Sequence, residues 1–221
     1  MIPRLIVVAT HNGDERVQQI AAATDDPILV VDTGSTTRNY LIRGAVLELP
    51  HVVGWIETPY KGYDTGAYLW AYFNVEAEHY MFMQDSCLPK ERNFADYFHI
   101  SMPKPLGVCA WNGFSMQIWD THEQRATVEY MYGEGPVPEQ GIFGPIFYTS
   151  RKTLDLLAKR QLLPPYPMHK QMAQAMERAW AIAFFRAQVR TVFLTESYDP
   201  DREAMSRGNL PFLIKTFGGR T

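Results

Sequence analysis

The sequence has few cysteines and no long apolar run. Only two of its 221 residues are cysteines, Cys87 and Cys109, too few for a disulfide framework, so both are expected to be free thiols in the core. No basic segment followed by an apolar run and a small-residue cleavage site opens the chain, and no apolar stretch approaches the roughly 20 residues that cross a bilayer. These absences argue against a disulfide-rich secreted domain and a membrane-spanning protein, and predict a cytoplasmic location.

The sequence also lacks internal repeats and low-complexity segments. Its 46% apolar and 13% aromatic residues are typical of a folded core and, at this length, predict one domain. The net charge of −3 is unevenly distributed: residues 1–144 carry 9 basic and 18 acidic side chains, whereas residues 145–221 carry 12 basic and 6 acidic ones. The basic C-terminal part indicates either an anionic partner (a diphosphate, a nucleic acid or a phospholipid surface) or scattered surface lysines and arginines.

Apolar runs alternate with helical patterns in the first 90 residues. The runs Leu5–Ala9, Pro27–Val31 and Tyr80–Met83 are typical of strands that are buried on both faces of a parallel sheet. Strand and helix in alternation predict an α/β fold with a mostly parallel sheet flanked by helices. The helices are expected over residues 16–24 and 63–77, and two further short strands over Ala45–Leu49 and His51–Ile56.

The pattern is less regular after Pro89. Residues 90–145 contain many aromatics, glycines and prolines, which predict short strands and long loops rather than a second domain. Phe147–Arg160 is expected to be a strand end and a helix, and Met168–Gln188 a long buried helix because it is apolar almost all round. The tail from Ser197 onward is expected to wrap the surface.

Polar side chains follow three of the predicted strands. Thr10-His11-Asn12, Asp32-Thr33-Gly34-Ser35-Thr36 and Gln84-Asp85-Ser86 each come directly after an apolar run. The carboxyl ends of parallel strands share one edge of the sheet, where ligands bind in open α/β folds. Each segment taken alone is equally consistent with a turn or a helix cap, but together they predict a site.

These segments resemble the nucleotide-sugar glycosyltransferases of the GT-A fold, especially the large inverting group with the cellulose- and chitin-type enzymes. Val30–Thr36 (VVDTGST) is similar to that family's strand and turn "VVDNGSTD", the Gly66–Ala77 helix follows a glycine-containing loop as in the family, and Gln84-Asp85-Ser86 occupies the place of its acidic "DxD". The likeness covers about the first 90 residues. Further on, Gly141–Pro145, before a strand and the helix from Arg151, is similar to the family's acceptor-side segment.

The resemblance implies a single GT-A domain over 1–221, with a nucleotide-sugar-binding half at 1–90 and an acceptor-side half with a C-terminal tail at 91–221. It implies a donor that is a UDP-sugar, held by the nucleotide-binding candidates Thr10, His11, Asn12, Asp32 and Asp64. Asp85 would face the diphosphate and a Mn²⁺ or Mg²⁺ ion, which stabilises the departing charge.

The chain departs from the family at this acidic cluster. Gln84 and Ser86 are neutral where the family has further carboxylates, so the resemblance implies a weaker metal site in which phosphate oxygens and water supply most ligands. In the competing interpretation, Asp85 only caps a turn and catalysis has been lost. His169 is a candidate for an additional metal ligand, although a single histidine is more often a surface or capping residue.

An inverting transfer needs a general base that takes the proton of the acceptor hydroxyl. Glu177 is the only acid between Leu156 and Thr195 and is favoured, although Arg178 makes a structural ion pair an alternative; Glu139, in a loop, is the rival base. In the basic tail, Lys215 and Arg220 would fold over the diphosphate, unless the terminus is disordered. Pocket side chains that would contact sugar or acceptor are Trp111, Asn112 and Trp119.

Three functions follow from these observations. The first is a glycosyltransferase that moves a sugar to a hydroxyl by a single displacement. A sugar-phosphate nucleotidyltransferase is disfavoured, because the chain lacks a glycine-rich loop with arginine after its first strand. A non-catalytic nucleotide-sugar or glycan binding module is the third. The acceptor stays open among a polysaccharide, a protein, a small molecule and a hydroxymethylated base of phage-type DNA, which would have to be flipped out of its duplex.

Overall fold

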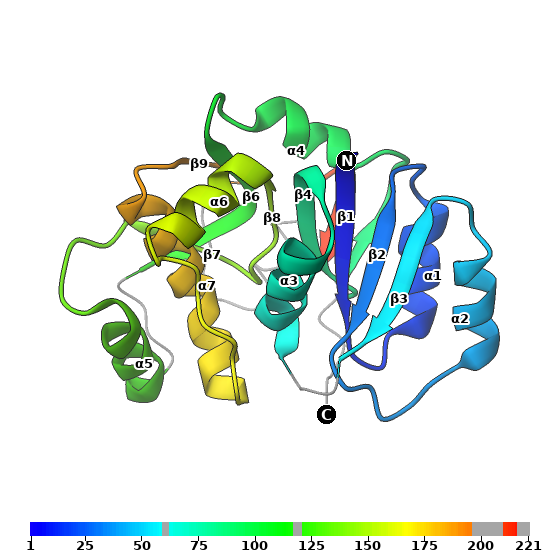
Figure 1. Ribbon diagram of the computed structural model, residues 1–221, viewed down its shortest axis with the longest axis horizontal. Coiled ribbons are helices and arrows are strands. Elements are labelled where there is room, and N and C mark those ends of the chain that lie inside the picture. The colour runs from blue at the N-terminus through cyan, green and yellow to red at the C-terminus, as the bar shows by residue number, and fades with distance from the viewer. Residues whose placement is uncertain (59–61, 117–120, 196–209, 216–221) are drawn as a thin grey trace.

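The computed structural model describes residues 1–58, 62–116, 121–195 and 210–215, with the side chain of residue 215 excepted. The described residues form a mixed sheet of eight strands with helices on both faces (Figure 1). Its strands are β1 (Ile2–Thr10), β2 (Ile28–Asp32), β3 (Val52–Glu57), β4 (Ala77–Gln84), β6 (Gly107–Ser115), β7 (Gln140–Ile142), β8 (Phe147–Ser150) and β9 (Arg190–Thr195). Their order is β3-β2-β1-β4-β8-β6-β7, and β9 pairs with β6.

The first four strands of the chain that join this sheet are parallel, which confirms the predicted α/β class. Thr10 lies opposite Asp32, Asp32 opposite Glu57, and Ala9 opposite Gln84. These strands therefore end together, and we call that end of the sheet the carboxyl edge. Strand β8 is antiparallel to both β4 and β6, so β6 runs in the same direction as β4 and also ends there.

Helices cover the two faces because alternate side chains of a strand point to opposite sides. On one face, Val7 and Phe82 belong to an apolar cluster with α3, α6 and α7; on the other, Val8 and Met83 pack with α1 and α4. We call these the α7 face and the α1 face. The helices are α1 (Asp14–Ala22), α2 (Tyr40–Leu47), α3 (Tyr63–Asn74), α4 (Ala95–Ser101), α5 (His122–Tyr132), α6 (Arg151–Lys159) and α7 (Lys170–Arg186).

The expected strand at Ala45–Leu49 is wrong, because this segment belongs to α2 and its end. The side chain of Asn39 caps that helix by accepting a hydrogen bond from the Ile42 amide at 3.3 Å. Arg43 and Val46, three residues apart, are its buried residues, which is the spacing of one helix face. A five-residue apolar run could not distinguish this pattern from a strand.

The expectation of short strands and long loops over residues 90–145 is wrong in part. This region contains α4 and α5 as well as β6, a strand of nine residues that is buried almost throughout. Thr121 caps α5 by accepting a hydrogen bond from the Gln124 amide at 3.2 Å. The long helix expected over Met168–Gln188 is confirmed as α7.

The C-terminal segment returns to the sheet through a short strand pair. β10 (Leu213–Lys215) is antiparallel to β5 (Cys87–Pro89), and Lys215 lies opposite Cys87, close after the end of β4. Most of the predicted surface-wrapping tail lies outside the described residues, but Leu210, Phe212 and Leu213 are buried in the α1-face cluster. This part of the chain therefore contributes to the core.

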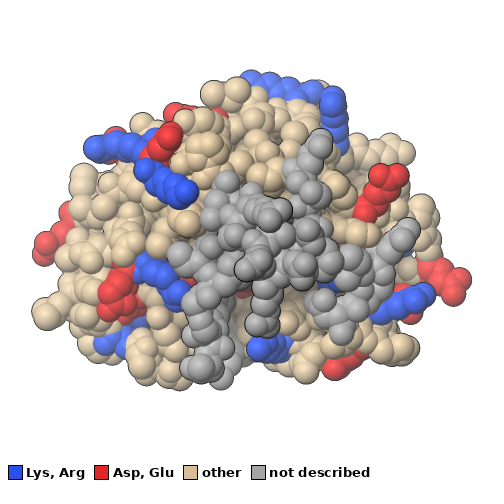
Figure 2. Space-filling model, turned by 180° about the vertical axis from the view of Figure 1, so that it is seen from behind, with Lys and Arg blue, Asp and Glu red and all other residues tan. Residues whose placement is uncertain are grey.

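Charged side chains of both signs lie on the surface of the described residues (Figure 2). In the rear view, the lysines and arginines of the described residues are intermixed with aspartates and glutamates (Figure 2). None of the helices in the described part of the chain is long and apolar enough to cross a bilayer.

Candidate functional site

The turns that follow β1 and β2 are bound to each other through Asn12. The side-chain oxygen of Asn12 accepts hydrogen bonds from the amides of Thr36 at 2.8 Å and Thr37 at 2.9 Å, while the Asn12 amide donates to Ser35 Oγ at 2.7 Å. Asn12 has a positive φ of 57°, which asparagine tolerates better than most residues. Two of the three polar strand ends predicted from the sequence are thus joined at the carboxyl edge.

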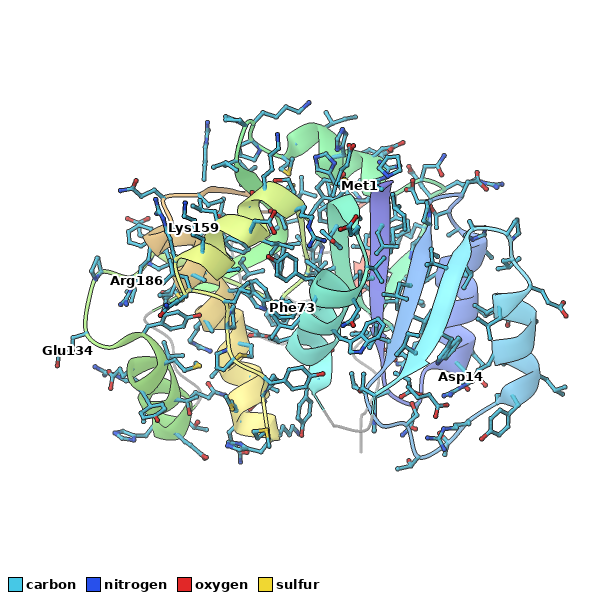
Figure 3. All side chains as sticks on the ribbon, viewed as in Figure 1. Met1, Asp14, Phe73, Glu134, Lys159 and Arg186 are labelled. Carbon is cyan, nitrogen blue, oxygen red and sulfur yellow. The ribbon has the colours of Figure 1, made fainter. Side chains whose placement is uncertain are left out.

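Arg43 is at the centre of a buried ionic cluster beside these turns. It is 5% exposed and donates to Asp14 Oδ2 at 3.0 Å and Oδ1 at 3.1 Å, to Asp32 Oδ2 at 2.7 Å and to Glu57 Oε1 at 2.6 Å. Its guanidinium also lies 4.7 Å from the centre of the Trp55 ring. In Figure 3, Asp14 is labelled near the carboxyl ends of the parallel strands. Burial alone lowers the pKa of Arg43, but the hydrogen bonds to Asp14 and Asp32, together with the negative charges of these carboxylates, outweigh it and raise that pKa.

Sequence reasoning missed Arg43, because its partners are far apart in the chain. Arg43 occupies part of the hydrogen-bonding capacity of Asp32, the predicted nucleotide ligand. Asp32 Oδ1 accepts from the Ser35 amide at 2.8 Å and Oδ2 from Arg43, and Asp32 is 1% exposed. Each carboxylate oxygen has a second lone pair, so a further hydrogen bond is chemically available, and the predicted role of Asp32 stays a prediction.

Asp85 is fully buried against the turn that leads into α1. Its Oδ2 accepts from Thr10 Oγ1 at 2.8 Å and from the His11 amide at 3.2 Å, and lies 3.6 Å from Arg16 Nη2. A Cβ at Gly13 would lie 2.1 Å from the same oxygen, so only glycine permits this approach. Asp85 therefore holds the end of β4 onto the end of β1.

The described side chains around Asp85 surround its Oδ2 oxygen with donors. Among the residues that the structure describes, no three His, Cys, Asp or Glu side chains are grouped to hold a metal ion, and the Asp85 oxygen already has hydrogen-bond donors and a guanidinium around it. His169, the second predicted ligand, is exposed at the start of α7, where its Nδ1 accepts a hydrogen bond from the Met172 amide at 3.4 Å. His169 therefore caps the start of α7, which is the alternative role that the sequence left open for it.

Gln84 and its neighbours form a polar group on the α7 face. Gln84 donates through Nε2 to the carboxylate of Asp64, in the first turn of α3, and Ser86 Oγ donates to Gln84 Oε1 at 3.1 Å. Asp64, predicted to bind nucleotide, thus lies beside the end of β4. Thr65 accepts a hydrogen bond from Trp180 Nε1 at 3.0 Å, so α7 is fixed to the start of α3.

The two candidate bases lie in different places. Glu177, on α7, accepts a hydrogen bond from the amide of Gly144 at 2.9 Å, in the loop that enters β8 at the carboxyl edge. Its neighbour Arg178 lies 4.7 Å from the centre of the Phe114 ring. Glu139 is exposed and precedes β7, and its carbonyl accepts a hydrogen bond from the Met116 amide at 3.0 Å, just after the end of β6. The structure thus brings Glu177 to the edge that carries Thr10 and Asp85.

The predicted sugar and acceptor contacts are largely interior residues. Trp111 is 1% exposed and packs in the α1-face cluster beside Phe143, and Asn112 is 5% exposed on β6. Trp119 and Arg220 lie outside the described residues. Of Lys215 only the backbone is described, opposite Cys87. The roles of these residues stay predictions.

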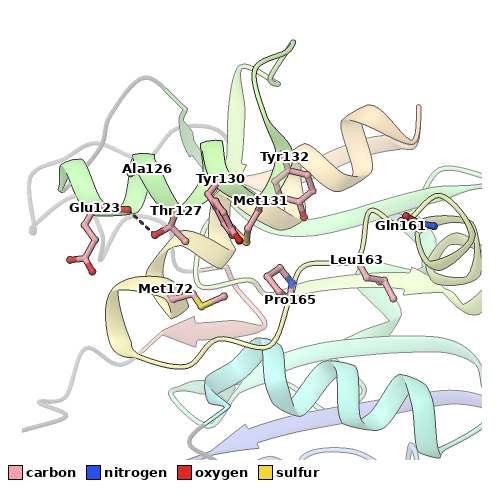
Figure 4. A pocket seen from close by; sticks show the side chains of 10 residues that line it. All are labelled: Glu123, Ala126, Thr127, Tyr130, Met131, Tyr132, Gln161, Leu163, Pro165 and Met172. Carbon is pink, nitrogen blue, oxygen red and sulfur yellow. Dashed lines mark hydrogen bonds between the residues drawn. The ribbon is translucent and has the colours of Figure 1, made fainter.

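A separate cavity of about 860 Å³ lies between α5 and the chain that leads into α7 (Figure 4). Sequence reasoning assigned it no role. Among the described residues that line it, Glu123 is the one charged side chain, so these residues offer no cation for a diphosphate, and the carboxyl edge stays the better donor site on chemical grounds. The wall is formed by Glu123, Ala126, Thr127, Tyr130, Met131, Tyr132, Gln161, Leu163, Pro165 and Met172.

The sheet order, the mixed strand directions and the helices on both faces define the GT-A fold, the fold of many glycosyltransferases. Two similar solved structures are glucosyl-3-phosphoglycerate synthase from Mycobacterium tuberculosis, in complex with Mn²⁺, UDP and phosphoglyceric acid (13% identity, TM-score 0.53), and S. aureus TarS 1–349 in complex with UDP (13% identity, TM-score 0.51). Each comparison covers 94% of this chain; the chain spans 75% of the synthase and 64% of the TarS chain. No protein-family model and no curated protein matches the sequence.

Proposed function

We propose that this chain is a glycosyltransferase that binds a UDP-sugar at the carboxyl edge and transfers the sugar to a hydroxyl group with inversion. One observation carries the proposal: the polar residues at the ends of β1, β2 and β4 meet at one edge of a sheet with the GT-A topology. The two solved structures with the same fold contain UDP, which supports the choice of nucleotide.

The donor half of the proposed site consists of Thr10, His11, Asn12, Asp32 and Asp64. The turns after β1 and β2 are fixed by hydrogen bonds before any ligand arrives, so little conformational freedom is lost on binding. Asn12 and Asp32 supply amide and carboxylate groups of the kind that recognise a base and a ribose. Lys215 and Arg220 are proposed to approach the diphosphate.

Glu177 is proposed as the general base. In the reaction, the acceptor hydroxyl gives its proton to the Glu177 carboxylate while its oxygen bonds to the anomeric carbon. The bond from that carbon to the diphosphate oxygen breaks, and its electron pair leaves with UDP. The hydrogen bond from the Gly144 amide at 2.9 Å orients the carboxylate for this step. Trp111, Asn112 and Trp119 are retained as proposed contacts of the sugar or acceptor.

Calorimetric titration with UDP, and with GDP for comparison, tests the donor site. We expect UDP to bind and GDP to bind more weakly. If neither nucleotide binds with or without Mn²⁺, the proposal fails.

Substitution of the proposed general base, Glu177, tests the chemistry. With UDP-glucose and a panel of hydroxyl acceptors that includes hydroxymethylated DNA, Glu177→Gln should lower the rate of UDP release roughly 10²- to 10⁴-fold and leave UDP affinity unchanged. Glu139→Gln is the matched control and should retain full rate. A loss in Glu139→Gln alone would move the base to Glu139. Nucleotide binding with no transfer by the wild type to any acceptor would favour the non-catalytic binding module.

A further inference from the structure

The cations at the carboxyl edge differ in how many carboxylates surround them. Arg43 faces three, from Asp14, Asp32 and Glu57, and Arg38 shares Glu57 at 3.2 Å. The charge of Arg43 is compensated within the fold. Among the residues that the structure describes, Arg16, in the first turn of α1, has one carboxylate within ion-pair distance, that of Asp85 at 3.6 Å.

Arg16 is also placed to bind a second anionic group. Its distance to Asp85 Oδ2 exceeds that of a hydrogen bond, and a quarter of its side chain (25%) is exposed, whereas Asp85 is fully buried. A guanidinium presents several N–H donors in a planar fork that matches phosphate oxygens. Arg16 can therefore approach a diphosphate without leaving Asp85.

Asp85 is poorly suited to the metal role. A ligand to Mn²⁺ or Mg²⁺ directs a carboxylate oxygen at the ion, but Asp85 Oδ2 points at Thr10 Oγ1 and the His11 amide, with Gly13 closing in on the same atom. A cation beside this oxygen would also stand next to the Arg16 guanidinium. Gln84 and Ser86, the flanking residues, are hydrogen-bonded to each other.

Strand β10 brings the backbone of a second basic residue close to the end of β4. Lys215 of β10 lies opposite Cys87, two residues after Asp85. The pairing fixes the backbone of this residue beside the end of β4.

We infer that the diphosphate of the donor is bound by Arg16, with Asp85 as the counter-ion of that arginine, and that binding needs no resident divalent cation. The inference rests on the proposed function, because it concerns the same donor site. It assigns Arg16 a substrate-binding role that sequence reasoning did not give it.

The experiment is UDP titration of the full chain by calorimetry, once with Mn²⁺ and once with EDTA. The variants are Arg16→Gln, Arg16→Lys and Asp85→Asn, and the matched control is Arg125→Gln, an arginine on α5 that pairs with Glu129 at 2.8 Å. Thermal unfolding of each variant verifies that it is folded.

The inference expects wild-type affinity for UDP to be the same in Mn²⁺ and EDTA within about twofold. Arg16→Gln should weaken binding roughly tenfold to a hundredfold, as expected for loss of a charged hydrogen bond, Arg16→Lys should recover part of it, and Arg125→Gln should change nothing. In Asp85→Asn the UDP affinity should again be the same in Mn²⁺ and EDTA, because the inference gives the Asp85 carboxylate no role as a metal ligand.

Different failures are distinguishable. UDP binding that appears only with Mn²⁺ and is lost in Asp85→Asn would overturn the inference and leave the proposed glycosyltransferase standing. If Arg16→Gln binds like the Arg125→Gln control, Arg16 has no such role. If the wild type binds no UDP in either buffer, the proposed function fails and the inference with it. If Asp85→Asn does not fold, two results still test the inference. They are the UDP affinity of the wild type with Mn²⁺ and with EDTA, and the UDP affinities of the two Arg16 variants.

Discussion

The buried charge of Arg43 connects residues from four elements. It joins Asp14 of α1, Asp32 of β2 and Glu57 of β3 to its own helix α2. A buried cation surrounded by carboxylates is weak evidence of net stabilisation, because desolvation offsets the attraction. Removal of the cation alone is different, because it leaves buried carboxylates without a counter-charge. The cluster thus fixes the shape of the turns that carry the proposed donor site.

Arg43→Met tests this account. We expect unfolding free energy to fall by about 3–5 kcal/mol, the usual range when one partner of a buried pair is removed, as measured by urea denaturation. Arg125→Met, which removes an exposed pair on α5, should have little effect. Equal effects in the two variants would contradict a structural role for the Arg43 cluster.

At the scale of elements, the contact between α3 and the chain before α7 depends on two glycines. A Cβ at Gly62 would lie 2.3 Å from Tyr166 Cε1, and one at Gly66 would lie 2.8 Å from it. The Tyr166 ring therefore packs directly on the backbone of the first turn of α3. Together with the hydrogen bond between Trp180 and Thr65, this contact holds α7, and so Glu177, over the carboxyl edge.

Gly66→Ala should reveal the competition between packing and helix propensity. Alanine is favoured over glycine inside a helix by about 1 kcal/mol, but the clash with Tyr166 costs about 1–3 kcal/mol, so we expect net destabilisation in thermal or urea unfolding. In a Tyr166→Leu background the same exchange should become stabilising. Gly44→Ala in α2 is the control, because its Cβ would meet nothing within 4 Å, and it should stabilise. A Gly66→Ala variant that gains stability in the wild-type background would refute the packing account.

At the scale of the whole molecule, a histidine pair lies at the opposite edge of the sheet. His99 and His79 are in edge contact with ring centres 5.2 Å apart, and His99 Nδ1 is 2.9 Å from the hydroxyl of Tyr148. Burial, and after it the charges of His79, Arg4 and Lys104, lower the pKa of His99. The unfolded chain therefore binds a proton at this histidine at a higher pH than the folded protein does.

This difference gives a pH dependence with a definite sign. Between the ordinary histidine pKa of about 6.5 and the lower folded value, the unfolded state holds more protons, so unfolding free energy falls as the pH falls through this range. Unfolding curves at pH 7.5 down to pH 5 should show a smaller decline for His99→Gln than for the wild type. A constant difference between the two proteins at every pH would mean that His99 does not contribute.

Local patterns predicted the parts of the fold that depend on neighbours in the chain. Three apolar runs form strands, because continuous β-branched and apolar residues suit a sheet that is covered on both faces: Leu5–Ala9, Pro27–Val31 and Tyr80–Met83. The apolar segment Met168–Gln188 is too long for a strand, and α7 lies within it. Ala45–Leu49 was assigned to the wrong element because five residues are too few to separate the two periods. The helices within 90–145 were missed because their capping, as at Thr121, is a single weak signal.

The sequence by itself determined the α/β class, the strand-end positions of Thr10, Asp32 and Asp85, and the resemblance to the GT-A glycosyltransferases, because apolar periodicity and turn residues are local properties. Only the tertiary structure decided which groups surround those side chains. Arg43 meets three carboxylates, Arg16 meets Asp85, Gly144 meets Glu177, and Lys215 lies beside Cys87. These contacts join distant segments, and the charge and hydrogen bonds that decide what an aspartate can bind come from its neighbours in space.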